Sequence, residues 1–261
     1  MLCPNKMHPF GPARCQLLLA LAATCFLIAG PAIAKDDSMV MAIPAKGWPP
    51  YIIAEKTPRG IMVDVMRQIA ATANLEIQFI NYPDKRALMR LCDGTVDAYP
   101  KSRDWVTDPA DYLWTDPVLN SQDVLIFRKG KTWDFSQPHE RNEKRIGCVF
   151  GYRYPKLEPF FASQKLKRAN APNSKAMLLM LARGRTEAAV ANKNVALWLM
   201  GTTFELNRND FEFSEKPLGT APYAFAFSRT KRWERFIALF NSELAAMKKD
   251  GRFQAILEKY R

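Results

Sequence analysis

The sequence predicts an α/β protein in which strands and helices alternate, a pattern typical of parallel sheets. Short runs rich in Val, Ile and Phe recur along its 261 residues, and segments with helical spacing of apolar residues lie between them. The clearest helical face holds Met62, Val65, Met66, Ile69 and Ala73. A second α/β series begins after the hydrophilic, aperiodic stretch 131–144, which we interpret as a boundary or a surface loop.

The expected elements follow in order. In the first series we expect strands at 39–45, 76–80, 95–100 and 123–130, and helices within 60–75 and 84–94. In the second series we expect strands at 145–151, 186–192, 211–215 and 222–230, and helices at 174–184 and 194–201. Two helices close the chain. The first has a wide apolar stripe formed by Trp233, Phe236, Ile237, Phe240, Leu244 and Met247, and the second follows Gly251.

Residues 1–34 have the pattern of a secretory signal peptide. A flank with Lys6 and Arg14 precedes an apolar run, and "PAIA" ends before Lys35. The run is short for a membrane span, and "LAATC" before Cys25 is a poor lipid-attachment signal. We therefore expect a soluble exported protein, located in the periplasm, that is cleaved after Ala34.

Composition limits the function of the remaining chain. Removal of the first 34 of 261 residues leaves 227 and lowers the net charge from +12 to +10, which favours anionic ligands. His139 is then the one histidine, so a histidine-rich metal site is excluded, and no metal or cofactor is expected. Basic residues do not interleave with aromatic residues, so nucleic acid is not expected as a partner. Cys92 and Cys148 remain; two buried thiols are the simpler interpretation, and a disulfide stays open.

The segment "KGWPPYII" behind the first predicted strand displays Trp48 and Tyr51 on a stiff turn, because prolines cannot continue a central strand. These rings could cover the edge of the core or face a ligand.

The ordered set "RGIMVDVMRQIA", "CDGTVDAY", "WTDPVLNSQDVLIF", "RIGCVFGYRY", "LARGRTEAAVAN" and "KKDGRFQAILEKY" resembles the extracellular solute-binding proteins of family 3, the periplasmic receptors of polar-amino-acid ABC importers. The resemblance implies a two-lobed type II periplasmic-binding-protein fold with a cleft between the lobes. Lobe 1 would be 39–127 plus 225–261, and lobe 2 would be 128–224. Strands crossing near Ile126 and Phe225 would form the hinge, and closure about it would enclose a ligand.

The same resemblance implies that the loop holding Trp48 and Tyr51 lines the cleft. The family's Thr-x-x-Arg motif, whose Arg binds a ligand carboxylate, is broken here because Ala110 follows Thr107 at that spacing. Arg103, with Lys101 and Ser102 beside it, could substitute, or it could be a solvated loop charge.

In lobe 2, Asn192 stands where the family has an Asp that pairs with the ligand's ammonium group, and it could equally cap the next helix. The segment "FGYRYP" is expected to open a helix that would suit an anion near Arg153. Tyr99 and Tyr152 could add wall surface or belong to the core.

These departures predict a solute-binding protein, a monomer, whose ligand is a small carboxylate-bearing or otherwise anionic molecule with an apolar or aromatic part. Its partner would be an ABC permease or another periplasmic or membrane protein. Two alternatives are an accessory protein of a sensor kinase or oxidoreductase, and a dehydratase that would use Glu187, Asp104, Asp108 or a less obvious carboxylate as its acid. No residue is marked as catalytic.

Overall fold

The computed structural model describes residues 38–137 and 142–260, so the predicted signal peptide and His139 lie outside the described residues. The strands are β1 (Ser38–Pro44), β2 (Glu76–Tyr82), β3 (Ala98–Lys101), β4 (Leu113–Trp114), β5 (Leu119–Arg128), β6 (Lys144–Val149), β7 (Leu166–Ala171), β8 (Ala188–Asn192), β9 (Phe211–Phe213) and β10 (Gly219–Phe227). The α-helices are α1 (Ile61–Thr72), α2 (Asp84–Cys92), α4 (Glu158–Ala162), α5 (Ser174–Ala182), α6 (Lys193–Thr202), α7 (Glu234–Asp250) and α8 (Arg252–Lys259). Single 3-10 turns are η1 (Arg103–Trp105), η2 (Pro109–Asp111) and η3 (Arg208–Asp210).

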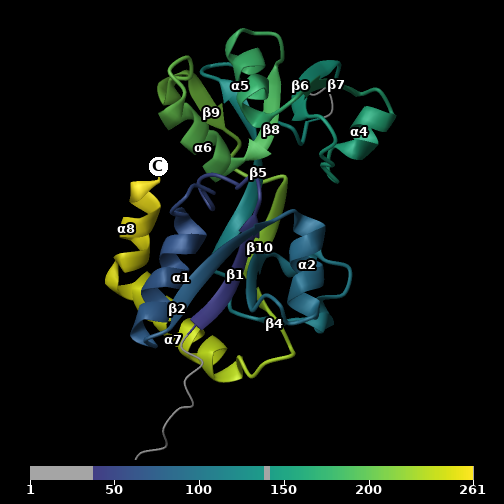
Figure 1. Ribbon diagram of the computed structural model, residues 1–261. Coiled ribbons are helices and arrows are strands. Elements are labelled where there is room, and N and C mark those ends of the chain that lie inside the picture. Colours follow the sequence, from purple (N-terminus) through teal and green to yellow (C-terminus); the bar gives the residue numbers. More distant parts are fainter. Residues whose placement is uncertain (1–37, 138–141, 261) are drawn as a thin grey trace, which may run out of the picture. The chain divides into compact units, whose positions relative to one another are not determined.

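In the first lobe the strands pair in the order β2-β1-β3-β10. β1 is parallel to β2 and β3, and β10 is antiparallel to β3. Because successive side chains of a strand point to opposite faces, β1 contributes to two cores. Met39, Met41 and Ile43 pack with α1, α7 and α8, whereas Ala42 packs with α2. Figure 1 shows α1 and α8 on one side of these strands and α2 on the other.

In the second lobe the order is β5-β8-β6-β7, with β6 parallel to both of its neighbours and β5 antiparallel to β8. One face of this sheet packs against α5 and α6, through side chains such as Met177 and Met200. The other face packs against α4 and the turn before it, where Leu157 is fully buried. The strands and helices that the apolar pattern predicted for the second series are thus present in this sheet and its two faces.

Two strands, β5 and β10, belong to both lobes. They pair antiparallel from Leu119↔Tyr223 to Asp123↔Gly219. Beyond this segment β5 pairs with β8 and β10 pairs with β3. The change of partner falls near Asp123 and Tyr223, a few residues before the positions that the resemblance suggested for the crossing.

The other predicted strands and helices are present, but β4 and β7 were missed and the start of α4 was expected too early. "FGYRYP" does not open a helix, because residues 150–157 form turns and α4 begins only at Glu158. The prolines explain the delay: a residue before Pro155 is disfavoured in helical conformation, whereas Pro159 is tolerated in the first turn of α4.

The two cysteines are both free thiols, Cys92 exposed on α2 and Cys148 buried in β6. Burial raises the pKa of the Cys148 thiol to about 12, so this thiol stays protonated near neutral pH. Within 38–137 and 142–260, no helix has the length and apolarity that crossing a membrane requires.

Candidate functional site

The turn behind β1 is held by backbone bonds. Trp48 and Ile52 exchange two backbone hydrogen bonds of 2.7 and 3.1 Å. The carbonyls of Pro50 and Tyr51 accept hydrogen bonds of 3.0 Å from the amides of Ile61 and Met62, which begin α1 and have no acceptor within the helix. The turn is therefore fixed to the N-terminus of α1.

Only glycine fits at position 60 beside this turn. Gly60 has φ 122°, and a Cβ atom there would lie 2.5 Å from the Tyr51 carbonyl oxygen. Its amide donates to the Tyr260 hydroxyl at 2.8 Å, so the end of the chain supports the same loop.

Four aromatic rings form one cluster above the turn. Trp48 lies 4.4 Å from Tyr51 and 5.6 Å from Trp105, measured between ring centroids. Tyr223 of β10 contacts the other three rings at 5.3 to 5.4 Å. Tyr51 and Tyr223 are buried, whereas Trp48 is half-buried and Trp105 is exposed. The two tryptophans are therefore the rings available to a ligand.

The Tyr51 side chain crosses to the second lobe. Its hydroxyl donates to Asn192 Oδ1 at 2.8 Å and accepts a hydrogen bond from Asn194 Nδ2 at 3.2 Å. Asn192 Nδ2 in turn donates to Ser121 Oγ of β5 at 2.9 Å. Burial raises the pKa of Tyr51 to about 12, so the phenol keeps its proton and remains a donor at neutral pH.

Asn192 also caps α6, as the sequence suggested. Its Oδ1 accepts hydrogen bonds from the amides of Asn194 and Val195 at 3.1 and 3.2 Å. With Tyr51, this oxygen has three donors, and the side-chain nitrogen has its own acceptor. The Asn192 side-chain oxygen is thus occupied by the protein itself, and one of the two N–H groups of its nitrogen is used as well.

A pocket of about 600 Å³ opens beside this network, a volume typical of small-molecule sites. It is lined from the first lobe by Trp48 and Trp105, from β5 by Ser121 and Asp123, and from the second lobe by the segments 149–154, 173–175 and 190–199 in part. The loops after β1 and β6 and the start of α6 after β8 all reach it, as expected for a ligand site at the carboxyl ends of strands.

The pocket is lined by both positively and negatively charged side chains. Arg153 and Lys175 line the pocket as exposed cations. Lys175 lies in the first turn of α5. The side chain of Asn173 caps this helix by accepting a hydrogen bond of 2.9 Å from the Ala176 amide. Asp123 supplies a negative charge to the same pocket. Burial raises the pKa of its carboxyl above the usual range.

Four of the nine residues suggested by the sequence line this pocket: Trp48, Tyr152, Arg153 and Asn192. Tyr51 lies directly behind Asn192. The sequence did not suggest Asp123, Trp105, Lys175 or Trp198. A candidate in a strand, such as Asp123, has no local signal, because its neighbours in the pocket come from distant parts of the chain.

The remaining four residues, Tyr99, Lys101, Ser102 and Arg103, have partners elsewhere. Asp84 accepts hydrogen bonds from the Tyr99 hydroxyl at 2.8 Å and from Lys101 Nζ at 2.6 Å. Ser102 is buried and its hydroxyl caps η1.

Arg103 lies with its guanidinium carbon 5.5 Å from the ring centroid of Trp114, at a separate depression next to Arg229. None of these four side chains lines the 600 Å³ pocket.

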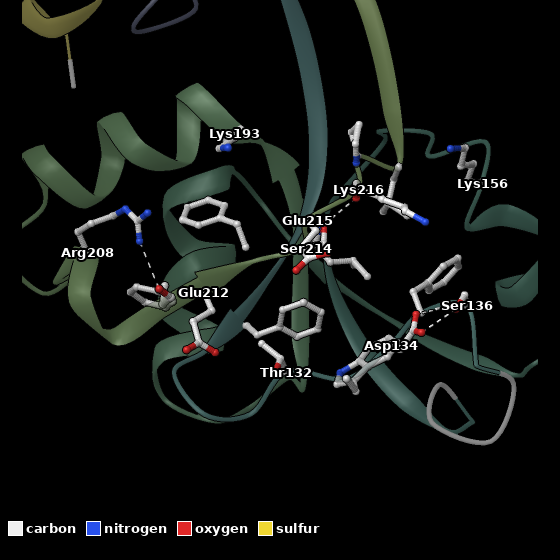
Figure 2. Close-up of a pocket in the computed structure, with 18 residues that line it drawn as sticks. Thr132, Asp134, Ser136, Lys156, Lys193, Arg208, Glu212, Ser214, Glu215 and Lys216 are labelled. Carbon is white, nitrogen blue, oxygen red and sulfur yellow. Dashed lines mark hydrogen bonds between the residues drawn. The ribbon is translucent and has the colours of Figure 1, made fainter.

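A larger cavity of about 1280 Å³ lies in the second lobe beside β9 (Figure 2). Two of its charged groups, Arg208 and Glu212, have local partners. Arg208 donates to the Phe211 carbonyl at 3.2 Å and lies over the Phe213 ring, and Glu212 accepts from the Gly130 amide at 3.1 Å. None of the residues suggested by the sequence lines it, so the smaller pocket is the candidate site. The described part of the chain holds no cluster of three or more potential metal ligands.

The family model of bacterial extracellular solute-binding proteins, family 3, matches residues 40–261. The chain belongs to this family. Members are binding proteins, and the family includes the substrate-binding domains of amino-acid ABC transporters. No curated protein matches this solute-binding protein significantly in sequence.

Solved structures of low sequence identity share its fold. The second substrate-binding domain of GlnP from Lactococcus lactis, in an open conformation, is 20% identical with a TM-score of 0.68, over 88% of this chain and 98% of that one. An ancestral cationic amino acid solute-binding protein is 17% identical with a TM-score of 0.69, over 86% and 95% of the two chains. A histidine kinase sensor domain similar to periplasmic binding proteins is 18% identical with a TM-score of 0.58, over 85% and 95%. These likenesses confirm the predicted type II fold of the solute-binding protein.

Proposed function

We propose that this solute-binding protein captures a small carboxylate-bearing molecule with an apolar or aromatic part in the 600 Å³ pocket. The observation that carries the proposal is the lining of that pocket, which joins tryptophans from the first lobe with Arg153 and Lys175 from the second. The cations would hold the carboxylate and the rings would contact the apolar part. Contact with both lobes would favour the closed arrangement.

We propose that the protein is exported to the periplasm through cleavage after Ala34, acts as a monomer without a cofactor, and delivers its ligand to an ABC permease. The net positive charge and the leader-like N-terminus support this role. It is a binding role and not catalysis.

Thermal unfolding tests the proposal. The melting temperature would be recorded with amino acids, carboxylates, amines and aromatic acids. A ligand at roughly one hundred times its dissociation constant adds about 2.7 kcal/mol, which for a domain of this size raises Tm by about 5–10 °C. We expect the carboxylates to give the shift. Arg153→Glu and Lys175→Glu should each reduce it, whereas Arg183→Glu at the other end of α5 changes net charge equally and should not. Absence of any shift would favour an accessory or sensor role instead.

A second candidate function has one observation in its favour. The dehydratase alternative needs a carboxylic acid in the pocket, and Asp123 supplies one with a raised pKa, as a general acid requires. Glu187, by contrast, accepts from the backbone amide and guanidinium of Arg145 at 2.7 and 3.1 Å. Chromatographic detection of a product from prephenate-like acids would establish this alternative.

A further inference from the structure

The segment 149–154, which follows β6, brings Arg153 to the pocket. This residue is exposed and lines the pocket, and within the described part of the chain its side chain forms no hydrogen bond or ion pair. Its guanidinium is therefore available to a ligand. Its two neighbours in the chain, Tyr152 and Tyr154, are instead bound to the rest of the second lobe through their backbone atoms.

One ion pair provides these backbone contacts. Arg168 of β7 and Glu158 of α4 lie 3.1 Å apart, measured from Nη1 to Oε1. Arg168 Nη2 donates to the Tyr152 carbonyl and, at 3.4 Å, to the Val149 carbonyl. Glu158 Oε1 accepts from the Tyr154 amide at 3.0 Å. The pair therefore holds the segment at three points, two before the pocket cation and one after it.

The guanidinium of Arg168 is itself fixed in place. The side chain is only 22% exposed, and its Nε donates to Asn170 Oδ1 at 3.0 Å. Its guanidinium carbon lies 5.6 Å from the ring centroid of Tyr154 and 5.4 Å from that of Phe161. The planar fork of a guanidinium can bind a carboxylate through one nitrogen and carbonyls through another, which the single nitrogen of a lysine cannot do.

Burial of side chains does little to hold the middle of the segment. Phe150 is 75% exposed and Tyr152 is 58% exposed, so their rings gain little from the hydrophobic effect. The Phe150 amide donates to the Ala171 carbonyl at 2.8 Å, which fixes the start of the segment to the end of β7. Around the pocket cation, the conformation depends on the contacts with Arg168 and Glu158.

We propose that Arg168 is a positioning residue for the pocket and acts through its ion pair with Glu158. The pair fixes the backbone on both sides of Arg153, so that this guanidinium meets the ligand carboxylate in one preorganised position. Arg168 does not line the pocket and acts only through the segment that it holds. This inference rests on the proposed function and adds how the anchor for the carboxylate is kept in place.

Limited digestion with chymotrypsin tests the inference without a ligand. The protease cuts after exposed aromatic residues, here Phe150 and Tyr152 in the segment and the fully exposed Phe204 as a reference elsewhere in the lobe. Arg168→Lys keeps a cation for Glu158 but has one nitrogen for three acceptors. We expect cleavage in the segment to be about tenfold faster in this variant, because proteolysis follows the population of the opened segment, and cleavage after Phe204 to be unchanged.

Arg145→Lys is the matched control. Arg145 forms a comparable ion pair with Glu187 at 3.1 Å, and it lies near the start of β6, at the end away from the segment. This variant should leave all cleavage rates unchanged. Glu158→Ala releases the Tyr154 amide and should also accelerate cleavage in the segment, so the inference stays testable if Arg168→Lys does not fold. Unchanged cleavage in the segment would overturn the inference, and so would an equal acceleration after Phe204, which would show a general loss of stability.

Calorimetry with benzoate and 3-phenylpropanoate tests the link to binding. Arg168→Lys should weaken the binding of these carboxylates about tenfold, the order seen when a residue that orients a binding group is replaced, and Arg145→Lys should not weaken it. Undiminished affinity in Arg168→Lys would overturn the inference and leave the proposed function intact. If the unchanged protein bound no carboxylate, the proposed function would be rejected, and the digestion alone would decide whether Arg168 holds the segment.

Discussion

Replacement of Tyr51 by Phe removes one oxygen from the contact between the lobes. The ring is fully buried and stays packed against Trp48 and Tyr223 at centroid distances of 4.4 and 5.4 Å. The losses are the hydrogen bond donated to Asn192 at 2.8 Å and the one accepted from Asn194 at 3.2 Å. Tyr51→Phe therefore isolates the polar part of the contact.

The expected loss of stability depends on which hydrogen bonds Asn192 and Asn194 retain in the variant. Asn192 Oδ1 retains two backbone donors, and the half-buried Asn194 can turn its amide to water, so neither group is left unsatisfied. Each hydrogen bond then counts at its net value of about 1 kcal/mol. We expect a loss of about 1–2 kcal/mol in the free energy of unfolding, which lowers Tm by about 2–8 °C for a domain of this size.

Circular dichroism during heating, combined with urea unfolding, measures both quantities. Tyr82→Phe is the matched control, because that hydroxyl makes no side-chain hydrogen bond within the described residues, and its loss should change stability by less than about 0.5 kcal/mol. If Tyr51→Phe had the same melting temperature as the unchanged protein and the control, the Tyr51 hydroxyl would not form a hydrogen bond across the lobes. The argument that Tyr51 occupies the Asn192 side-chain oxygen would then fail as well.

Three further predictions come from other parts of the molecule. Tyr260→Phe removes a hydroxyl that donates to Asp64 at 2.8 Å and accepts from an amide before α1, so urea unfolding should show a loss of about 1–2 kcal/mol; no change would contradict that contact. Alkylation followed by peptide mapping should modify Cys92 and spare Cys148 in the folded protein, because the latter is buried with a raised pKa; equal labelling would refute its burial. The raised pKa of Asp123 means that the folded state holds this proton more tightly than the unfolded state. Its contribution to stability is thus present at low pH and is lost as pH rises through the folded-state pKa, and a comparison of urea midpoints with Asp123→Asn across pH 3–8 should show the two proteins converging at the acid end.

The sequence predicted the fold well because each element has a local signal. β1 alternates between two cores, α1 has one apolar face, and α7 buries Phe240, Leu244 and Met247 of its predicted stripe. The missed strand β7 has the sequence "LKRANA", in which charged and small residues hide the alternation. The helix expected to open at "FGYRYP" begins only at Glu158, because a residue before Pro155 is disfavoured in helical conformation.

The candidate site could be predicted only where position in the fold was enough. Trp48 follows β1 and Asn192 ends β8, so the family pattern placed both at the cleft. Arg103 was suggested as a substitute for the Arg of the broken family motif, and a cation–π contact with Trp114 holds it elsewhere. The hydrogen bond between Tyr51 and Asn192 joins residues 141 positions apart, and no local pattern encodes such a pairing.

The Asn at position 192 and the Asp at position 123 are two parts of one arrangement. They are neighbours across β5 and β8, so carboxylates at both positions would repel each other in a poorly solvated site, and one of them would have to stay protonated. A neutral Asn at the helix cap avoids that conflict and still accepts from Tyr51 and from the first turn of α6. The negative charge that appeared to be lost from the family position is thus found one strand away. Asn192 considered alone therefore does not show that the pocket lacks a negative charge, because Asp123 lines the same pocket.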